Sequence, residues 1–399
     1  MKRITIALFT LLFALSLSAC ITIKSDLGDI NLSSEESEMT SEEFYGTLSE
    51  LESQTAESEE FRNTPIDDFI YEYDAGLSGI KITAYTGDAK RITLPEKIGD
   101  DFVVAFELHN SNITEVVIPD SQHITTISQD AFSGCSSLST VTMPEHINSI
   151  EKNAFAFCGN LVNITLPSSL KTIGDNAFYC CTNLSAVTIP KEVQSIGNYA
   201  FYQCYSLSEI TLPGTKSIGE GAFCDCTNLS KVIFENGTST IGSSAFYGCE
   251  NLTTVNLPNS VSSLGDRAFT FCTNLTTITL SNALVSIEDK TFAYCQNLSE
   301  IKFPDNVQNL GKGVFTECTA LQKVTLNNQL TSIGSCAFAN CTSLRQLELP
   351  NSVKTIGNDA FLYCNSLRVK DLETDSDYTH NNWNDLYSNS KTESTAVSE

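Results

Sequence analysis

The stretch LVNITLPSSLKTIGDNAFYCCTN, residues 161–183, is one unit of the repeat that decides the fold. Its first part, Leu161-x-x-Ile164-x-Leu166-Pro167, ends in an alternation of apolar and polar residues. This alternation predicts a short strand with one buried face. Pro167 should end the strand, because proline cannot donate a hydrogen bond to a neighbouring strand.

The second part of the unit has the spacing of a short helix. Its apolar residues stand at offsets 0, 4, 5, 8 and 11, on one helical face: Ile173, Ala177, Phe178, Cys181 and Leu184. Gly174 supplies a turn before this helix. Asp175 is suited to be its N-cap, as are residues at the same position in other units: Asn198, Ser243, Asp266 and Asn358.

Cysteine and phenylalanine mark the period. The cysteines recur every 23 residues, with one step of 22, at Cys135, Cys158, Cys181, Cys204, Cys226, Cys249, Cys272, Cys295, Cys318, Cys341 and Cys364. A phenylalanine stands three residues before each of them. A unit of this length cannot bury its apolar side alone, so neighbouring units must stack. The sequence therefore predicts an α/β solenoid with a parallel β-sheet on one face and short helices on the other. One residue is missing at 213–218, where we expect a local irregularity.

The pattern L-x-x-I-x-[LI]-P-x-x-V-x-x-I-G-x-x-A-F-x-x-C-x-x-L resembles the BspA-type leucine-rich repeats of bacterial surface proteins. The resemblance covers residues 131–367, and its motif is highly specific. It implies a leucine-rich-repeat fold and adhesion to host matrix proteins, other bacteria or glycans. Residues 71–95 look like the strand-rich N-terminal cap seen before such repeats, and residues 96–130 hold degenerate units.

The chain starts like an exported lipoprotein. A short basic start precedes an apolar run at residues 4–17, which is too short for a stable membrane span and is typical of a signal peptide. The run ends in Leu17-Ser18-Ala19-Cys20, which looks like the lipobox of bacterial lipoproteins. We therefore expect Cys20 to be the lipidated mature N-terminus. The alternative is a plain secretory signal with an incidental cysteine.

The net charge of −25 lies mostly in the flanks: −14 at residues 21–74, −6 at 371–399 and only −7 in the body between them. The acidic flanks would repel a polyanion, so we expect no nucleic-acid binding. The Ser/Glu-rich segment cannot bury enough apolar surface to offset its ordering entropy. The expected layout is a lipoprotein signal peptide at 1–19, a lipidated acidic disordered linker at 20–60, an N-terminal cap with degenerate repeats at 61–130, BspA-type leucine-rich repeats at 131–367 and an acidic C-terminal tail at 368–399. The tail, which contains Trp383, either covers the last repeat or is disordered.

Candidate catalytic and metal-binding groups are sparse. The repeat cysteines fit small buried residues of the core, and we expect free thiols because stacked cysteines would need an unfavourable disulfide dihedral. The redox state of the extra Cys180, Cys224 and Cys336 stays open. The sequence has no paired C-x-x-C of zinc-site spacing, and we expect His146 in a solvent-facing loop. We therefore expect no catalytic residue, no cofactor and no metal.

Polar residues alternate with apolar ones along each predicted strand and should line one continuous face. These candidate ligand-binding residues are Thr140, Thr142, Asn163, Thr165, Thr188, Glu209, Thr211, Thr254, Asn256, Thr277, Thr279, Glu300, Lys302, Lys323, Thr325, Gln346 and Glu348. Threonine suits parallel strands through its β-propensity, which is one explanation of the pattern. The other is an extended polar platform for a protein or glycan.

The leading hypothesis is a non-catalytic, monomeric lipoprotein on a bacterial cell surface, extracytoplasmic and held to the membrane by its lipid anchor alone. Its repeats would present a platform for an extracellular protein or glycan in adhesion or host interaction. The alternative is a structural envelope component that binds cell-wall polymer or another envelope protein of the same cell. An enzyme would need its chemistry from the N-terminal cap, where we find no plausible set of acid, base and nucleophile.

Overall fold

The structure, a computed structural model, describes residues 21–25, 28–32, 64–371 and 376–378. The expected signal peptide, Cys20 and the part of the tail that holds Trp383 lie outside the described residues. The chain forms two compact units, Met1–Glu60 and Phe61–Glu399. In the first, β1 (Ile21–Ser25) and β2 (Gly28–Leu32) form an antiparallel hairpin inside the segment expected to be a linker.

The second unit begins with a four-stranded sheet. A 3-10 helix, η1 (Ile66–Asp68), leads into β3 (Phe69–Asp74), which pairs antiparallel with β4 (Gly79–Tyr85). The sheet continues through β7 (Asp101–Phe106), parallel to β4, to β6 (Lys97–Ile98). Ile82 and Phe106 are fully buried and connect this sheet to the core of the following coils.

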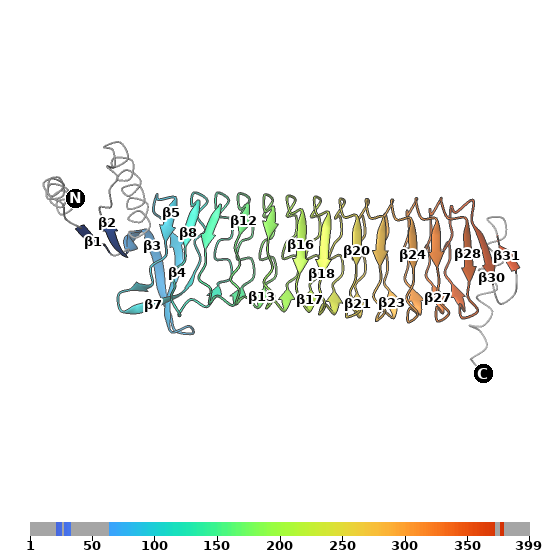
Figure 1. The fold of residues 1–399 in the computed structure, drawn as a ribbon, viewed down its shortest axis with the longest axis horizontal. Helices are drawn as coiled ribbons and strands as arrows, with labels where there is room; N and C mark the ends of the chain where they lie inside the picture. Colours follow the sequence, from blue (N-terminus) through green and yellow to red (C-terminus); the bar gives the residue numbers. More distant parts are fainter. Residues whose placement is uncertain (1–20, 26–27, 33–63, 372–375, 379–399) are drawn as a thin grey trace. The chain divides into compact units, whose positions relative to one another are not determined.

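From Arg91 onward the chain winds as a solenoid whose coils place short strands in two rows (Figure 1). The first row contains β5 (Arg91–Thr93), β8 (Glu115–Val117), β10 (Thr140–Thr142), β12 (Asn163–Ile164), β14 (Ala186–Val187), β16 (Glu209–Leu212), β18 (Lys231–Phe234), β20 (Thr254–Asn256), β22 (Thr277–Thr279), β24 (Glu300–Lys302), β26 (Lys323–Thr325), β28 (Gln346–Leu349) and β30 (Arg368–Asp371). Where these strands pair with one another they are parallel, as in β16 with β18 and β20 with β22. After β30, β31 (Ser376–Tyr378) pairs antiparallel with it.

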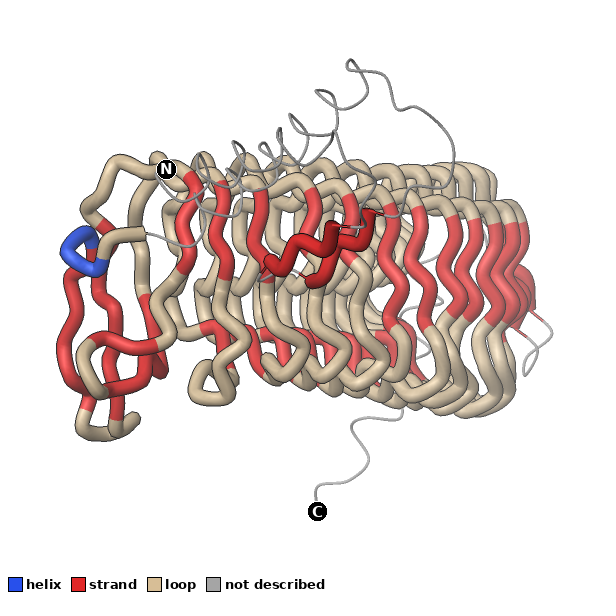
Figure 2. Tube along the Cα trace, turned by 60° about the vertical axis from the view of Figure 1, so that its left-hand side comes forward, coloured by secondary structure: helices blue, strands red, loops and turns tan. Residues whose placement is uncertain are grey.

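A second row of strands was not predicted (Figure 2). It contains β9 (Thr126–Ile127), β11 (Ser149–Ile150), β13 (Thr172–Ile173), β15 (Ser195–Ile196), β17 (Ser217–Ile218), β19 (Thr240–Ile241), β21 (Ser263–Leu264), β23 (Ser286–Ile287), β25 (Asn309–Leu310), β27 (Ser332–Ile333) and β29 (Thr355–Ile356). Ile173, taken from the sequence as the start of a helix, is a buried residue of this parallel row, opposite Ile150 and Ile196.

The predicted face of short helices is wrong. Within the described ranges the 3-10 turn at Ile66–Asp68 is the only helix, and tight turns occupy residues 174–181. Asn176 and Cys180 have φ of 54° and 56°, in the left-handed region that interrupts an α-helix. Alternate backbone N–H groups also point out of the coil: that of Phe178 donates to the Ala200 carbonyl of the next repeat at 2.7 Å. The intervening N–H groups close turns within the coil, as from Cys181 to the Phe178 carbonyl at 3.1 Å.

The residues expected to cap helices instead connect neighbouring coils. The Asp175 carboxylate accepts the backbone N–H of Asn198 at 2.7 Å, and the Asn198 side chain accepts that of Glu220 at 2.8 Å. Ser243, at the same position, donates to Asp266 of the next coil at 2.5 Å. Side-chain oxygens at this position therefore satisfy donors of the neighbouring repeat or bond to its equivalent side chain.

Phenylalanine and cysteine form two parallel columns in the core. Phe155, Phe178 and Phe201 are fully buried, and their rings stack with centroids 5.1 Å apart at each step. A buried ring of this kind contributes ~1.5–3 kcal/mol through burial, and each stacked pair adds ~0.5–1.5 kcal/mol. The cysteines fill the core as expected but also donate: Cys181 Sγ lies 3.1 Å from the Phe155 carbonyl oxygen. The same bond recurs in other repeats, as from Cys249 to Phe223 at 3.2 Å.

The shortened repeat is irregular where the sequence predicted. Gly214 has a φ of 77°, and the next residue, Thr215, takes the buried place of the missing valine. Its hydroxyl has no hydrogen-bond partner within the part of the chain that the structure describes. Asn327, which replaces a strand-ending proline, is buried and donates from Nδ2 to the Val307 carbonyl at 2.9 Å. Both repeats keep their place in the stack.

Candidate ligand-binding face

The seventeen candidate residues all have exposed side chains on the first row of strands or directly after a strand. Parallel register brings them side by side, as Thr254 opposite Thr277 and Asn256 opposite Thr279. The residue between each pair points inward: Val255 is 1% exposed. We call the outward side of the first row the strand face.

The same register adds residues to the strand face that the sequence analysis missed. The additional members with exposed side chains are Ala186, Lys231, Ile233, Arg368 and Lys370, which lie opposite Asn163, Glu209, Thr211, Gln346 and Glu348. Counting one repeat onward from each predicted residue would have found them. Ile233 is 38% exposed, so the face is not purely polar.

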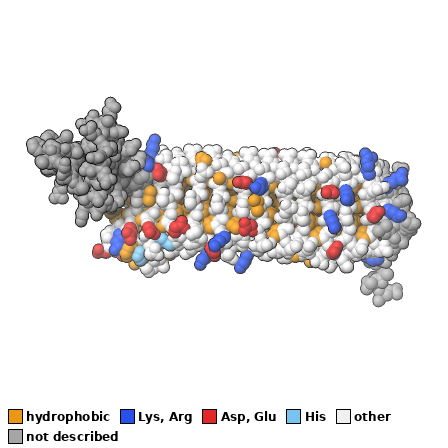
Figure 3. Space-filling view, in the orientation of Figure 1, with side chains coloured by type: hydrophobic (Ala, Val, Ile, Leu, Met, Phe, Trp, Pro, Cys, Tyr) orange, Lys and Arg blue, Asp and Glu red, His pale blue; other side chains and the backbone are white. Residues whose placement is uncertain are grey.

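Charged side chains on the strand face pair between neighbouring strands. Glu209 lies 3.8 Å from Lys231, and Glu300 lies 4.0 Å from Lys323. Exposed pairs of this kind stabilise a fold by only ~0–1 kcal/mol. Their main effect is therefore on the local charge of the strand face. Figure 3 shows backbone and side chains that are neither charged nor hydrophobic over most of the visible described surface, with charged side chains in separate groups along it.

Two hollows lie at two of the four places where the first row is interrupted among its described strands. No ladder pairing joins β22 to β24 or β26 to β28 among the described strands. A hollow of about 330 Å³ spans the first interruption, and one of about 490 Å³ spans the second. Both are lined by Lys323 and Thr325, which therefore lie at the centre of a shallow groove running from Thr277 to Pro350.

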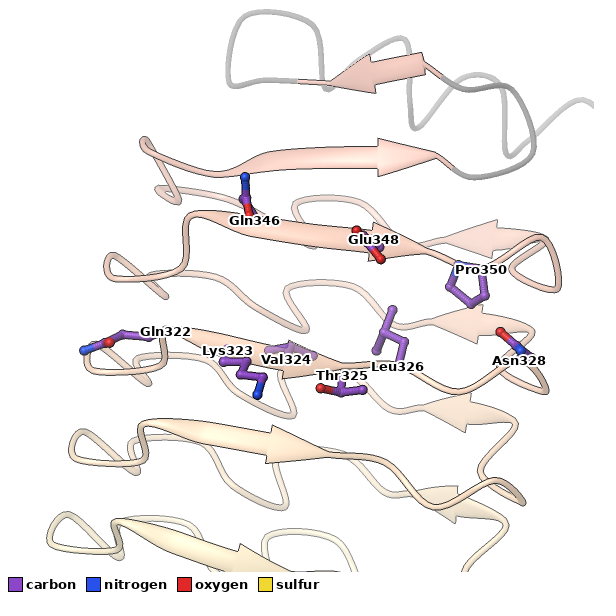
Figure 4. Close-up of a pocket in the computed structure, with 9 residues that line it drawn as sticks. All are labelled: Gln322, Lys323, Val324, Thr325, Leu326, Asn328, Gln346, Glu348 and Pro350. Atoms are coloured by element: carbon purple, nitrogen blue, oxygen red, sulfur yellow. The ribbon is translucent and has the colours of Figure 1, made fainter.

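The groups around the larger hollow suit recognition of a polar chain. Figure 4 shows Lys323 and Thr325 on β26 beside Gln346 and Glu348 on the neighbouring strand β28, with Pro350 beyond the end of that strand. Together they offer an ammonium, a hydroxyl, an amide and a carboxylate, which can donate to and accept from hydroxyl or peptide groups. The ring of Pro350 adds an apolar contact of the kind found in many ligand sites.

His146 does not lie in a solvent-facing loop as predicted. Its side chain is 19% exposed, and Nε2 lies 2.8 Å from the Ser121 carbonyl oxygen and 3.0 Å from that of Ile124. Nδ1 is 3.1 Å from an oxygen of Asp120. The ring therefore connects its turn to the preceding one through backbone carbonyls and a carboxylate.

Burial raises the pKa of the repeat thiols from Cys135 to Cys341 and so favours their protonated form. Burial raises the pKa of Cys135 to about 11 and that of Cys249 well above its ordinary value. Residues 64–371 contain no group of three or more His, Cys, Asp or Glu side chains placed to hold a metal ion. Across the same described part of the chain, no helix has the length and apolar character needed to cross a membrane.

Comparison with protein families gives one strong match. A model of the BspA type leucine rich repeat region matches in six copies, at residues 103–229, 194–319 and 285–394. A search of curated proteins found no match to the sequence.

Several solved structures are similar to the chain. A leucine-rich repeat protein from Bacteroides ovatus is 26% identical, with a TM-score of 0.48, over 77% of this chain and 94% of that one. A leucine rich cell surface protein from Faecalibacterium prausnitzii is 22% identical, with a TM-score of 0.42, over 74% and 95%. The leucine-rich repeat protein of T. pallidum is 27% identical, with a TM-score of 0.32, over 65% and 90%.

Proposed function

The chain belongs to the BspA-type leucine-rich repeat family, and from this premise we propose that its strand face binds an extracellular protein or glycan without catalysis. The protein would act as a bacterial surface lipoprotein in adhesion or host interaction. Solenoids offer extended surfaces of this kind because every repeat adds one strand to the same face.

The observation that carries the proposal is the shallow groove at Lys323. It joins two hollows over β22–β28 on a face whose other exposed side chains are mostly hydroxyls and amides. A flat row of threonines would suit strand formation alone, but the groove adds concave surface with convergent donors and acceptors. This geometry favours an extended ligand that lies across several strands over a compact small molecule.

We also propose that Cys20 carries the lipid that holds the protein at the membrane. The lipobox-like sequence before Cys20 supports this anchor. Two or more acyl chains would give stable attachment, since one chain alone is marginal. The repeats would then present their strand face outside the cytoplasm.

A pull-down with the full chain tests the proposed function. Matrix proteins, mucin and purified cell wall are offered separately, and the captured fraction is compared with that of Lys323→Glu. The proposal expects capture of a matrix protein or mucin that the variant loses. Enrichment of the cell's own wall polymer alone would contradict the adhesive role and favour a structural envelope component.

A further inference from the structure

The first strand of the four-stranded sheet that precedes the coils has a free edge. β3 stands at the end of the order β3-β4-β7-β6, and among the described strands it pairs with β4 alone. Outside that ladder, no backbone N–H or carbonyl of Phe69–Asp74 has a backbone hydrogen-bond partner within residues 64–371. A row of unpaired backbone groups can accept a further strand. The free edge of β3 is therefore open to another chain.

Large apolar side chains gather around this free edge. Residues 66–77 hold five of the eleven large apolar side chains that are exposed in the described part of the chain. Tyr71 is 44% exposed and Tyr73 is 57% exposed, whereas every residue of β4 is buried or half-buried. The ends of a solenoid need a polar outer surface for solubility. Apolar side chains at this edge oppose that need, and a contiguous exposed group of them is typical of a contact with a partner.

The aromatic side chains of β3 lie on one side of the sheet. From Tyr71, after the register shift at Ile70, the residues of the strand alternate between its two sides. Tyr71 lies opposite Ile82, and Tyr73 lies opposite Ile80. Both isoleucines are buried in the core, so the two tyrosines leave the sheet on its core side, beyond the last residues that the core covers.

The acidic side chains of β3 lie on the other side. Glu72 lies opposite Lys81, and Asp74 is two residues further along the same side. The Lys81 ammonium is held 2.6 Å from Glu107. That hydrogen bond raises the pKa of Lys81, and the charges of Glu72 and Asp74 raise it further against the opposing effect of burial. The nearest ammonium is thus already paired, which leaves negative charge at this side of β3.

The charge around the free edge favours a basic partner over a second copy of this chain. Residues 66–77 contain four acidic residues, Asp67, Asp68, Glu72 and Asp74, and no basic residue. None of the four forms an ion pair within residues 64–371. Two copies of β3 paired antiparallel would bring these carboxylates against one another, and like charges on facing strands are destabilising.

We propose that the free edge of β3 binds an extended segment of a partner polypeptide in which apolar and basic residues alternate. The segment adds a strand to the sheet through its main chain. Its apolar side chains cover Tyr71 and Tyr73, and its lysine or arginine side chains pair with Glu72 and Asp74 on the other side. This edge lies outside the strand face, and its occupation does not depend on the function proposed there.

Fluorescence anisotropy with the full chain tests the proposal. The probe is a short labelled peptide of alternating valine and lysine. One comparison peptide has glutamate in place of every lysine, and another has proline in place of the central valines, which removes backbone donors. The wild type should bind the valine–lysine peptide, and it should bind each comparison peptide at least about tenfold more weakly.

Two variants test whether the peptide binds at β3. Glu72→Lys and Tyr73→Thr both change exposed side chains, and threonine keeps the β-propensity of tyrosine, so both should fold. Glu72→Lys should weaken binding of the valine–lysine peptide about fivefold or more, because attraction becomes repulsion, and should strengthen binding of the valine–glutamate peptide. Tyr73→Thr should weaken the valine–lysine peptide about two- to fivefold, the size of one cross-strand contact.

Matched control variants make the same changes away from β3. Glu192→Lys alters an exposed turn between β14 and β15, and Tyr205→Thr removes a ring that is 38% exposed. Both should keep wild-type binding. Equal loss in a β3 variant and its control, unchanged binding in both β3 variants, or a proline peptide that binds as tightly as the valine–lysine peptide would overturn the proposal. A dimer in light scattering that Tyr73→Thr dissociates would also overturn it, in favour of a second copy of the chain.

Discussion

Replacing one core cysteine by alanine and by serine separates the two roles of the cysteine column, which are to fill the core and to donate a hydrogen bond to the preceding repeat. Cys249 is fully buried, and its Sγ donates to the Phe223 carbonyl of the preceding repeat at 3.2 Å. Cys249→Ala removes both the volume of the sulfur and the bond. Cys249→Ser keeps a donor of nearly the same shape and changes mainly its polarity.

The expected loss of stability depends on the other hydrogen-bond partner of the Phe223 carbonyl. Phe223 also accepts the backbone N–H of Cys226 at 3.2 Å, so alanine at 249 does not leave it unsatisfied. The loss is then one net hydrogen bond, ~0.5–1 kcal/mol, plus a void costing about 1 kcal/mol. We expect Cys249→Ala to lower the free energy of unfolding by roughly 1.5–2 kcal/mol, and Cys249→Ser to lower it by less than about 1 kcal/mol.

Urea unfolding followed by circular dichroism measures both variants against the wild type. Repeat arrays can unfold in stages, so the comparison holds only where the dependence on urea keeps the same slope. If serine destabilises the protein at least as much as alanine, the thiol hydrogen bond contributes nothing. The cysteines would then be retained for their apolar volume alone.

Three further predictions concern thiol protonation, backbone spacing and the anchor. Burial raises the pKa of Cys135 from 9.0 to about 11, so the unfolded chain loses this proton at lower pH than the folded chain does. The urea midpoint should therefore fall as the pH rises from 9.0 to about 11, and a constant midpoint across that interval would contradict this. Gly242→Ala places a Cβ 2.6 Å from the Gly219 carbonyl carbon, whereas the Cβ of Gly159→Ala meets Thr182 Oγ1 at an ordinary 3.7 Å. Gly242→Ala should therefore lower the urea midpoint far more than Gly159→Ala does. Equal midpoints would refute the idea that the coils need glycine at position 242 in order to approach closely. A fatty-acid probe should label the wild type and not Cys20→Ala, and equal labelling would exclude lipid at that cysteine.

The sequence predicted the first row of strands because residues that alternate between apolar and polar can place all their apolar side chains on one side only in a strand. Val255 and Ile278 are buried while Thr254 and Asn256 are exposed, as the alternation requires. Stacking followed from the period, since a short unit buries its apolar side only against the next. The outward residues of the strand face could therefore be named from the sequence.

The helices were wrong because two consecutive tight turns give the same apolar spacing as a helix. What separates the two is the left-handed backbone at positions such as Asn176 and Cys180, where other repeats have Tyr199, Gln203 or Lys290. These residue types share no preference that a sequence reader could recognise. The N–H groups that a helix would use internally bond to the next repeat, and a single unit cannot reveal this.

The groove of the candidate site also depends on neighbouring repeats. It lies at two breaks in the first row, between β22 and β24 and between β26 and β28, and no residue type marks those breaks. Comparing one position across adjacent repeats would therefore not have indicated the groove.

One measurement tests most directly whether the strand face is the binding surface. It is the dissociation constant of the molecule captured in the pull-down, compared between two variants in which a lysine is replaced by glutamate. Lys323→Glu changes the centre of the groove, and Lys171→Glu makes the same change at an exposed residue just before β13, in the second row. Both side chains are exposed, so both variants should fold. We predict at least about tenfold weaker binding for Lys323→Glu, the loss of a single charged interface contact, and wild-type binding for Lys171→Glu. Equal dissociation constants for the two variants would contradict binding through the strand face.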